Sequence, residues 1–118
     1  MNKLEIKINN FIKALQRLEE AADELYKEKD SAIVRDALIQ RFEFTYELAW
    51  KTTKDYLESL GIMDKNSPKA VIQEAYLQRL ILNEDSWLAM IKDRNMTSHL
   101  YKEELAKEIS KRIIDTYI

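Results

Sequence analysis

The chain has 118 residues, the size of one domain, and 46% of them are hydrophobic, which is enough to build a core. It contains no cysteine and one histidine, which excludes disulfides and thiolate metal sites and argues against structural zinc, so we expect no metal and no cofactor. A net charge of −2 and a pI near 5.5 do not favour generic nucleic-acid binding. Any RNA contact therefore has to come from a local basic patch or from a partner.

The N-terminal segment and the hydropathy pattern predict the cellular compartment. Residues 1–7 carry charges throughout and lack an apolar centre, so we do not expect a signal peptide. No apolar run approaches the roughly 20 residues that span a bilayer. We therefore expect a cytoplasmic protein that does not contact a membrane.

The fold class follows from the single glycine, Gly61, and the single proline, Pro68. Sheet proteins need many turns, and turns use Gly, Pro and Asn. Two breakers seven residues apart imply long helices with few connections. The sequence therefore predicts an all-α fold, an up-and-down antiparallel bundle of four to five helices.

The first predicted helix runs from about Lys3 to Lys29. Its apolar residues recur at alternating spacings of four and three, a narrow stripe that packs lengthwise on a neighbour at a shallow angle. A coiled coil with another chain stays open, but the short length favours an antiparallel neighbour within the domain. The stripe consists of Leu4, Ile8, Phe11, Leu15, Leu18, Ala22 and Leu25.

The second predicted helix is capped by Asp30 or Ser31 and ends at about Leu60, with Gly61 in a left-handed position after it. It is the most apolar and aromatic part of the chain, and its apolar residues do not share one stripe. Such a helix is central in the bundle or also faces a second subunit. We predict a homodimer through this helix, and the alternative is a broad intramolecular face with some exposed aromatic residues.

The third predicted helix starts with Ser67 as N-cap and Pro68 in its first turn, and it ends near residues 82–83. Asn83 or Asp85 then caps a fourth helix that runs to about Arg94. The inward side of the third helix is predicted to consist of Val71, Ile72, Ala75, Tyr76 and Leu80.

Arg94 lies on the same side of the fourth helix as Trp87 and Ile91, which are core-type residues. An arginine placed there needs a partner or an anionic ligand to offset its lost solvation. If Thr97 or Ser98 caps the last helix, the next residue lies in the first turn of that helix, where the helix dipole favours an anion.

The last predicted helix runs from about His99 or Tyr101 to the C-terminus. Its spacing of apolar residues predicts one inward side. That side consists of Leu105, Ile109, Ile113 and Thr116 or Tyr117.

Arg94 and His99 form a coherent chemical pair. A guanidinium binds phosphate with two N–H groups, and an imidazole transfers protons near neutral pH. The pair suits RNA cleavage by the ribose 2′-hydroxyl, which needs a base, an acid and charge stabilisation. Because one protomer has one histidine, a two-fold dimer would supply the second. Lys92 and Lys102 add local positive charge, and Tyr101 is expected either to donate a hydrogen bond to the phosphate or to be a modification site.

A structural role for the same residues stays open. Arg94 and His99 would then cap carbonyl groups or pair with an acid such as Asp93 or Glu103. The sequence offers no Gly-rich phosphate loop and no paired-histidine metal spacing as a competing site.

Three segments together resemble the nucleotidyltransferase substrate-binding protein family, which belongs to the HEPN superfamily and is related to the HepT toxins. They are the aromatic run 41–51, the segment 87–90, and the segment 94–101 with its R-x4-H-x-Y signature. The resemblance covers residues 1–118 as one HEPN-like helical bundle domain. The combination is specific, whereas R-x4-H alone would be weak.

The resemblance implies a homodimeric helical bundle encoded beside a small MNT-type nucleotidyltransferase. In the HepT relatives, the motif Arg and His form a metal-independent RNase at the dimer interface, and the partner transfers AMP to the motif tyrosine. By position, Arg94 and His99 would be catalytic, Tyr101 would accept AMP, and Asn95 would be the polar residue after the arginine. The alternatives are a non-catalytic subunit that binds substrate or nucleotide for the partner enzyme, and a plain helical interaction module.

Overall fold

The computed structural model describes residues 2–99 and 101–118, and all regular structure in them is helical, which confirms the predicted all-α bundle. No helix in these two ranges has the length and apolar content needed to cross a bilayer. The elements are α1 (Lys3–Lys27), α2 (Ala32–Ser59), α3 (Pro68–Leu77), α4 (Glu84–Met96), the short 3₁₀ helix η1 (Thr97–His99), α5 (Glu103–Arg112) and the π-helical turn η2 (Ile113–Tyr117).

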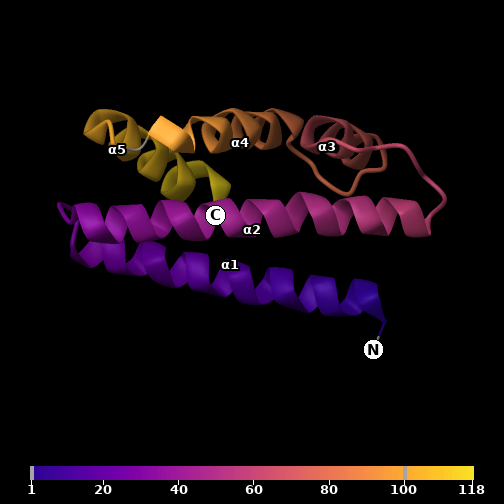
Figure 1. The fold of residues 1–118 in the computed structure, drawn as a ribbon, viewed down its shortest axis with the longest axis horizontal. Helices are drawn as coiled ribbons and strands as arrows, with labels where there is room; N and C mark the ends of the chain where they lie inside the picture. Colours follow the sequence, from indigo (N-terminus) through magenta and orange to yellow (C-terminus); the bar gives the residue numbers. More distant parts are fainter. Residues whose placement is uncertain (1, 100) are drawn as a thin grey trace.

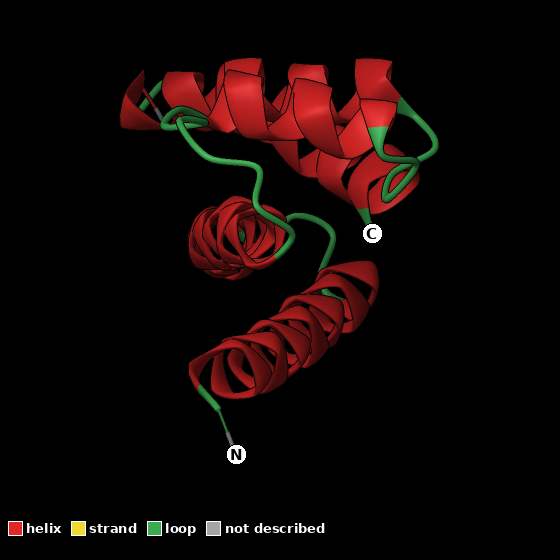
Figure 2. Cartoon of the chain, turned by 90° about the vertical axis from the view of Figure 1, so that its right-hand side faces the viewer, coloured by secondary structure: helices red, strands yellow, loops and turns green. Residues whose placement is uncertain are grey.

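The helices form three layers, and α2 is the middle one (Figures 1 and 2). The α1 helix runs antiparallel to α2 and covers one side of it, and α3, α4 and α5 cover the other side. The molecule measures 47 × 29 × 23 Å. The small angle between α1 and α2 matches the narrow apolar stripe of the first helix. Because α2 is covered on two sides by its own chain, its broad apolar surface is explained without a second subunit.

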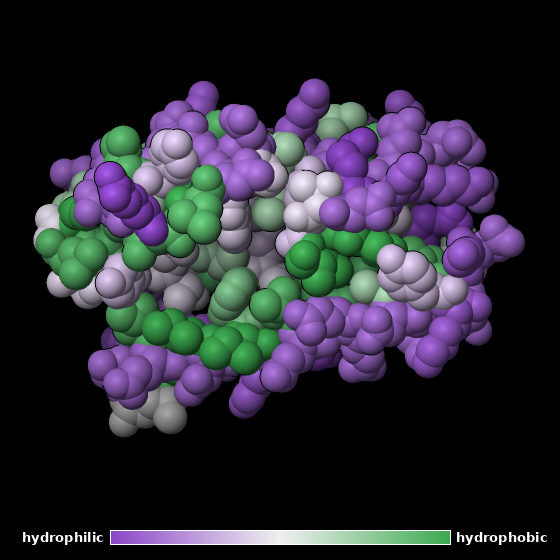
Figure 3. Space-filling model, turned by 180° about the vertical axis from the view of Figure 1, so that it is seen from behind, coloured by the Kyte–Doolittle hydropathy of each residue, from purple (hydrophilic) through white to green (hydrophobic). Residues whose placement is uncertain are grey.

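The core lies where α1, α2 and α5 meet. The stripe of α1 is buried in its C-terminal half, at Leu18, Ala22 and Leu25, whereas Ile8 near its start is 39% exposed. Seen from behind, apolar side chains lie between hydrophilic ones along the junction of the layers (Figure 3). The side chains buried most completely are Leu38, Ile39, Leu57, Ile109, Ile113 and Val71.

The starts of α2, α3 and α4 and the end of α2 follow the predicted capping residues. Gly61 has a φ of +85°, and the Ile62 N–H donates to the Leu57 carbonyl at 2.9 Å, which closes the end of α2 as a left-handed cap. Three predicted N-caps are confirmed, each accepting a backbone N–H at 3.0–3.2 Å: Ser31, Ser67 and Asn83.

The third helix is shorter than predicted, because it ends at Leu77 and not near residue 82. Arg79 adopts a left-handed φ of +60°, and the Leu80 N–H donates to the Ala75 carbonyl at 2.9 Å. An arginine thus ends this helix in the conformation that glycine usually supplies. Tyr76, in the last turn of α3, and Leu80, beyond its end, are 45% and 43% exposed, so their predicted burial was wrong.

The last helix begins later than predicted, at Glu103, and Thr97 and Ser98 do not cap it. The Thr97 hydroxyl donates instead to the Arg94 carbonyl at 2.8 Å and closes the end of α4. His99 therefore precedes α5 and does not lie in its first turn, so the predicted effect of the helix dipole on His99 was wrong. The inward side of the helix is confirmed at three positions, and its fourth residue is Tyr117: Leu105, Ile109, Ile113 and Tyr117.

Candidate functional site

Arg94 is half-buried near the end of α4, and its guanidinium is turned toward α2. Nη1 donates to the Thr97 hydroxyl at 2.9 Å, while Nη2 lies 3.9 Å from Glu43 Oε2 and Nε lies 3.9 Å from Glu47 Oε1. The predicted need for a partner is thus met by two carboxylates one helical turn apart. At 3.9 Å these are ion pairs but not hydrogen bonds. Arg94 Nε is buried and has no hydrogen-bond acceptor among the described residues.

The surface around Arg94 is a shallow, open hollow of about 320 Å³, lined also by Gln40, Glu43, Phe44 and Glu47. Its acidic side is partly neutralised, because Glu47 Oε2 accepts from Trp50 Nε1 at 3.3 Å and lies 3.4 Å from the Lys51 ammonium. The hollow therefore combines the half-buried Arg94 guanidinium with a carboxylate whose charge is partly neutralised.

Tyr46 lies on α2 near this hollow and is 4% exposed. Burial, and then the charge of Glu47, raise the pKa of Tyr46 to about 12, with a small opposing effect of Arg94. The phenol is neutral at physiological pH, so Tyr46 is a packing residue and not an acid–base group.

His99 and Tyr101 lie together at the exposed end of the α4–η1 segment. Their ring centroids are 6.3 Å apart at an interplanar angle of 66°, an edge-to-face arrangement. Tyr101 is 79% exposed, and the Lys102 ammonium lies 5.9 Å from its ring centroid. This corner therefore presents an imidazole, a phenol and a cation to solvent.

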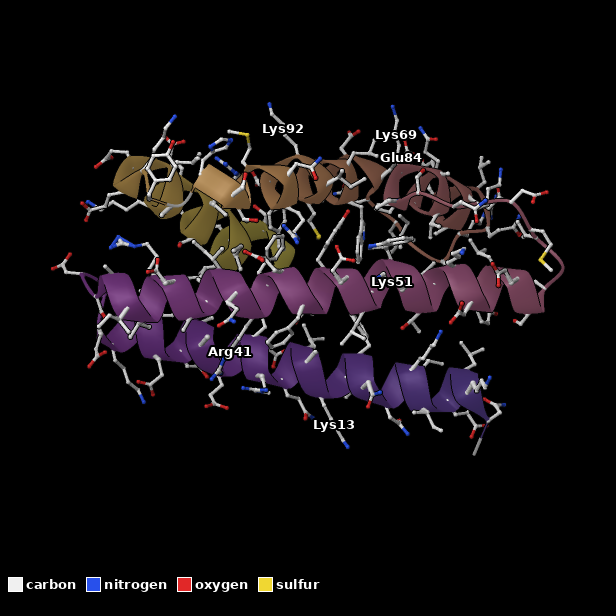
Figure 4. All side chains as sticks on the ribbon, viewed as in Figure 1. Lys13, Arg41, Lys51, Lys69, Glu84 and Lys92 are labelled. Atoms are coloured by element: carbon white, nitrogen blue, oxygen red, sulfur yellow. The ribbon has the colours of Figure 1, made fainter. Side chains whose placement is uncertain are left out.

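The structure brings some of the predicted site residues together and separates others. His99, Tyr101 and Lys102 form the exposed corner, whereas no hydrogen bond or ion pair within the described part of the chain joins Arg94 to His99. Asn95 and Lys92 are exposed on α4, and Lys92 projects away from α2 (Figure 4). In residues 2–99 and 101–118, no group of three or more His, Asp or Glu side chains is placed to hold a metal ion.

A sequence model of the family described as "Nucleotidyltransferase substrate binding protein like" matches residues 6–118. The chain belongs to this family. It is 32% identical over 111 residues to a protein named "Probable ribonuclease HepT" from Haemophilus influenzae, covering 87% of this chain and 76% of that protein. A crystal structure of a protein from Thermus thermophilus superposes with a TM-score of 0.80 at 39% identity, covering 89% of this chain and 87% of the other. The resemblance to HepT-like proteins is confirmed.

In this HepT-like family member, Asp93 directly precedes the motif, and its partners lie in the C-terminal part of the chain. Its side chain is 7% exposed and accepts hydrogen bonds from Arg112 Nε and Nη2, both at 2.8 Å, and from the Tyr117 hydroxyl at 2.5 Å. Asp93 therefore ties α4 to the C-terminal helix. It does not pair with Arg94 or His99, and Glu103 pairs with Lys107. The structural alternative, in which Arg94 pairs with an acid, therefore holds for Glu43 and Glu47 and not for the two acids named as examples, Asp93 and Glu103.

The Asp93 carboxyl is expected to make this protein less stable at acidic pH. Burial raises its pKa, but hydrogen bonds from Arg112 and Tyr117 outweigh burial, so the pKa lies below its ordinary value. Because the pKa is lower in the folded state, ionised Asp93 stabilises the fold at pH values above the unfolded-state pKa of about 3.9. This stabilisation is lost as the pH falls through the folded-state pKa.

We expect the urea midpoint of the wild type to fall between pH 5 and pH 3 by more than that of an Asp93→Asn variant, which has no carboxyl to protonate. Urea titrations of both proteins at pH 7, 5, 4 and 3 measure the difference. Parallel pH profiles for the two proteins would show that Asp93 does not carry this dependence.

Proposed function

We propose that this protein is a HepT-like, metal-independent endoribonuclease that acts as a homodimer and is the helical partner of a small MNT-type nucleotidyltransferase in a toxin–antitoxin-type pair. We propose further that residues 1–118 act as one domain. The observation that supports the activity best is the R-x4-H-x-Y arrangement of Arg94, His99 and Tyr101 in a chain related to a protein named as a probable ribonuclease.

The proposed reaction is cleavage of RNA by its own 2′-hydroxyl. His99 takes the proton of the 2′-hydroxyl, the 2′-oxygen attacks phosphorus, and the bond from phosphorus to the 5′-oxygen breaks. The leaving 5′-oxygen takes a proton from an imidazolium, and the products are a 2′,3′-cyclic phosphate and a 5′-hydroxyl. Arg94 binds the non-bridging oxygens, where negative charge builds up in the transition state.

The placement of the groups is the reason for proposing a dimer. In one protomer, the Arg94 guanidinium lies over the α2 hollow, and His99 lies at the exposed corner without a contact to it. A two-fold axis near the α4–η1 segment would bring two copies of the motif onto one RNA strand and supply both a base and an acid. Lys92, Asn95 and Lys102 are exposed, and in this arrangement they would contact the RNA backbone.

Regulation by the nucleotidyltransferase is proposed to act at Tyr101. The phenol oxygen attacks the α-phosphorus of ATP, the bond from the α-phosphorus to the bridging oxygen breaks, pyrophosphate leaves, and the phenol proton passes to water. The hydroxyl is accessible, because Tyr101 is 79% exposed, and its ring lies 6.3 Å from that of His99. An AMP group attached there would therefore add negative charge and bulk beside the proposed catalytic imidazole, and it would block RNA.

The second candidate function is a non-catalytic subunit that binds a nucleotide for the nucleotidyltransferase. It is favoured by the hollow beside Arg94, whose buried Nε lacks an acceptor among the described residues, and by the substrate-binding description of the family. This candidate predicts nucleotide affinity that depends on Arg94, without RNA cleavage.

The deciding experiment incubates the purified protein with RNA in EDTA and compares Arg94→Ala with Arg94→Lys. We expect the wild type to cleave RNA and Arg94→Ala to lower the cleavage rate by about 10²–10³-fold. Arg94→Lys recovers part of the rate, because lysine keeps the positive charge but cannot donate two parallel hydrogen bonds. Lys13→Ala is the control, because Lys13 projects from α1 away from the other helices (Figure 4). Full cleavage by Arg94→Ala would contradict the proposal, and Arg94-dependent AMP binding without cleavage would favour the second candidate.

A further inference from the structure

A cavity outside the R-x4-H-x-Y motif lies at the end of the molecule where α1 turns into α2 and α5 packs against them (Figure 1). It measures about 580 Å³ and is open to solvent. None of the residues proposed for RNA cleavage lines it. Its polar wall includes Lys29, Arg35, Lys107, Ser110 and Lys111.

Arg35 is the unusual member of this wall. It is 4% exposed, yet its guanidinium has no hydrogen bond, ion pair or ring contact with any described residue. By contrast, the guanidinium of Arg112 is held by a carboxylate, and that of Arg94 by a hydroxyl and two carboxylates. The guanidinium nitrogens are not among the fully buried, unpaired atoms of the described residues, so the charged end faces the open cavity, where a counter-ion can reach it.

Ser110, on α5, is a second unsatisfied group in the same wall. It is 3% exposed, and its hydroxyl has no hydrogen-bond partner in the described part of the chain. Buried polar groups are nearly always paired. Because the Ser110 oxygen is closed off from solvent, Arg35 is the donor that an acceptor in the cavity would meet first.

The charge of the cavity wall indicates whether the ligand is an anion or a cation. Four cationic side chains line the cavity against two carboxylates, those of Asp30 and Asp115, in a chain whose net charge is −2. One of the four, Lys107, already pairs with Glu103 and Glu104, which leaves Lys29, Arg35 and Lys111. Neither carboxylate pairs with Arg35, and Lys29 and Lys111 form no ion pair with a described residue. The cavity thus has an excess of positive charge, which favours an anion.

We propose that this cavity binds the phosphate group of a small phosphate monoester of mononucleotide size. Arg35 binds the phosphate with two N–H groups, and the Lys29 and Lys111 ammonium groups donate to its other oxygens. The volume suits such a ligand, because ligand pockets commonly measure about 300–1,000 Å³. Leu25, Tyr26 and Ile114 form the apolar part of the wall, against which the organic part of the ligand packs.

The test measures binding to the full chain by calorimetry, with inorganic phosphate, AMP and adenosine as probes. We expect phosphate and AMP to bind and adenosine to bind too weakly to measure. Arg35→Met and Lys111→Glu each weaken AMP binding by about tenfold or more, since each removes a charged donor. Lys69→Glu keeps the wild-type affinity, because Lys69 lies on α3 at the opposite end of the molecule (Figure 4).

The melting temperature without ligand provides a second readout. Arg35→Met keeps an unbranched apolar side chain at a position that is 4% exposed and removes a charge that pairs with no described residue, so we expect it to melt near the wild-type temperature while it loses the stabilisation by AMP. Lys111→Glu changes an exposed residue and keeps the fold, so it tests the cavity even if Arg35→Met does not fold.

Three results would overturn the proposal. One is the absence of phosphate and AMP binding to the wild type, including the case in which a short RNA binds and AMP does not. Another is equal AMP affinity of the wild type, Arg35→Met and Lys111→Glu. The third is AMP binding that Arg94→Ala abolishes and Lys111→Glu leaves intact, which would place the nucleotide in the α2 hollow. A failure of RNA cleavage leaves the cavity proposal standing, since the cavity does not include Arg94 or His99.

Discussion

A His99→Ala variant is expected to lose RNA cleavage by a factor of about 10²–10⁴, the usual contribution of a positioned acid–base group. The same variant is expected to unfold at the wild-type urea concentration, because His99 is exposed and its ring contact is with the exposed Tyr101. The combination of full stability and lost cleavage would separate a chemical role from a structural one. Cleavage rates under single-turnover conditions and urea midpoints measure the two effects.

Tyr101→Phe is the matched control for this prediction. It keeps the ring beside His99 and removes the hydroxyl, so cleavage continues, while modification by a nucleotidyltransferase at that position stops. If His99→Ala cleaves RNA at the wild-type rate, or if it loses stability and cleavage together, the imidazole is not the proton-transfer group.

An Asp93→Ala variant is expected to lose about 3 kcal/mol of unfolding free energy, the lower end of the range for breaking a buried ion pair. The lower end applies because the Arg112 side chain is 43% exposed and water can solvate it once the carboxylate is gone, whereas the Asp93 side chain is 7% exposed. The Tyr117 hydroxyl also loses its acceptor. Urea unfolding at pH 7 measures the loss.

Asp23→Ala is a suitable control for this variant, because Asp23 is an exposed acid on α1, and we expect its effect to stay within about 0.5 kcal/mol. A double-mutant cycle between Asp93→Ala and Arg112→Ala isolates the pair itself. Additive losses in that cycle would mean that the two side chains stabilise the protein independently, contrary to the geometry.

Local signals were sufficient to predict most of the fold from the sequence. A hydroxyl or amide side chain before an apolar run marks a helix start, and Ser31, Ser67 and Asn83 all act as predicted. Gly61 ends α2 because it adopts a positive φ without strain. These features depend on a few neighbouring residues, so a single sequence contains them.

The errors arose where a residue acts outside its usual preference. Arg79 ends α3 in a left-handed conformation that arginine seldom adopts, and nothing in its neighbours indicates this. Thr97 closes the helix behind it and does not cap the helix ahead, because its hydroxyl is engaged by the carbonyl and the guanidinium of Arg94. Both roles are open to a threonine, and the three-dimensional contact decides between them.

The site was predictable in part. The motif places Arg94, His99 and Tyr101 in one segment, but the direction of each side chain depends on α2, half a chain away. The pairing of Arg94 with Glu43 and Glu47 bridges about 50 residues, and that of Asp93 with Tyr117 bridges 24. Contacts between residues so far apart in the chain produce no periodic pattern in a single sequence, so they could not be predicted from it. The buried, unpaired Arg35 likewise became visible only once its surroundings were placed.

The most direct test of the central proposal is the chemical identity of the RNA ends after incubation with the purified protein in EDTA, read by mass spectrometry. The proposed mechanism predicts 2′,3′-cyclic phosphate and 5′-hydroxyl ends from the wild type and uncut RNA with His99→Ala. Ends that carry a 3′-hydroxyl and a 5′-phosphate, or equal cleavage by both proteins, would contradict it.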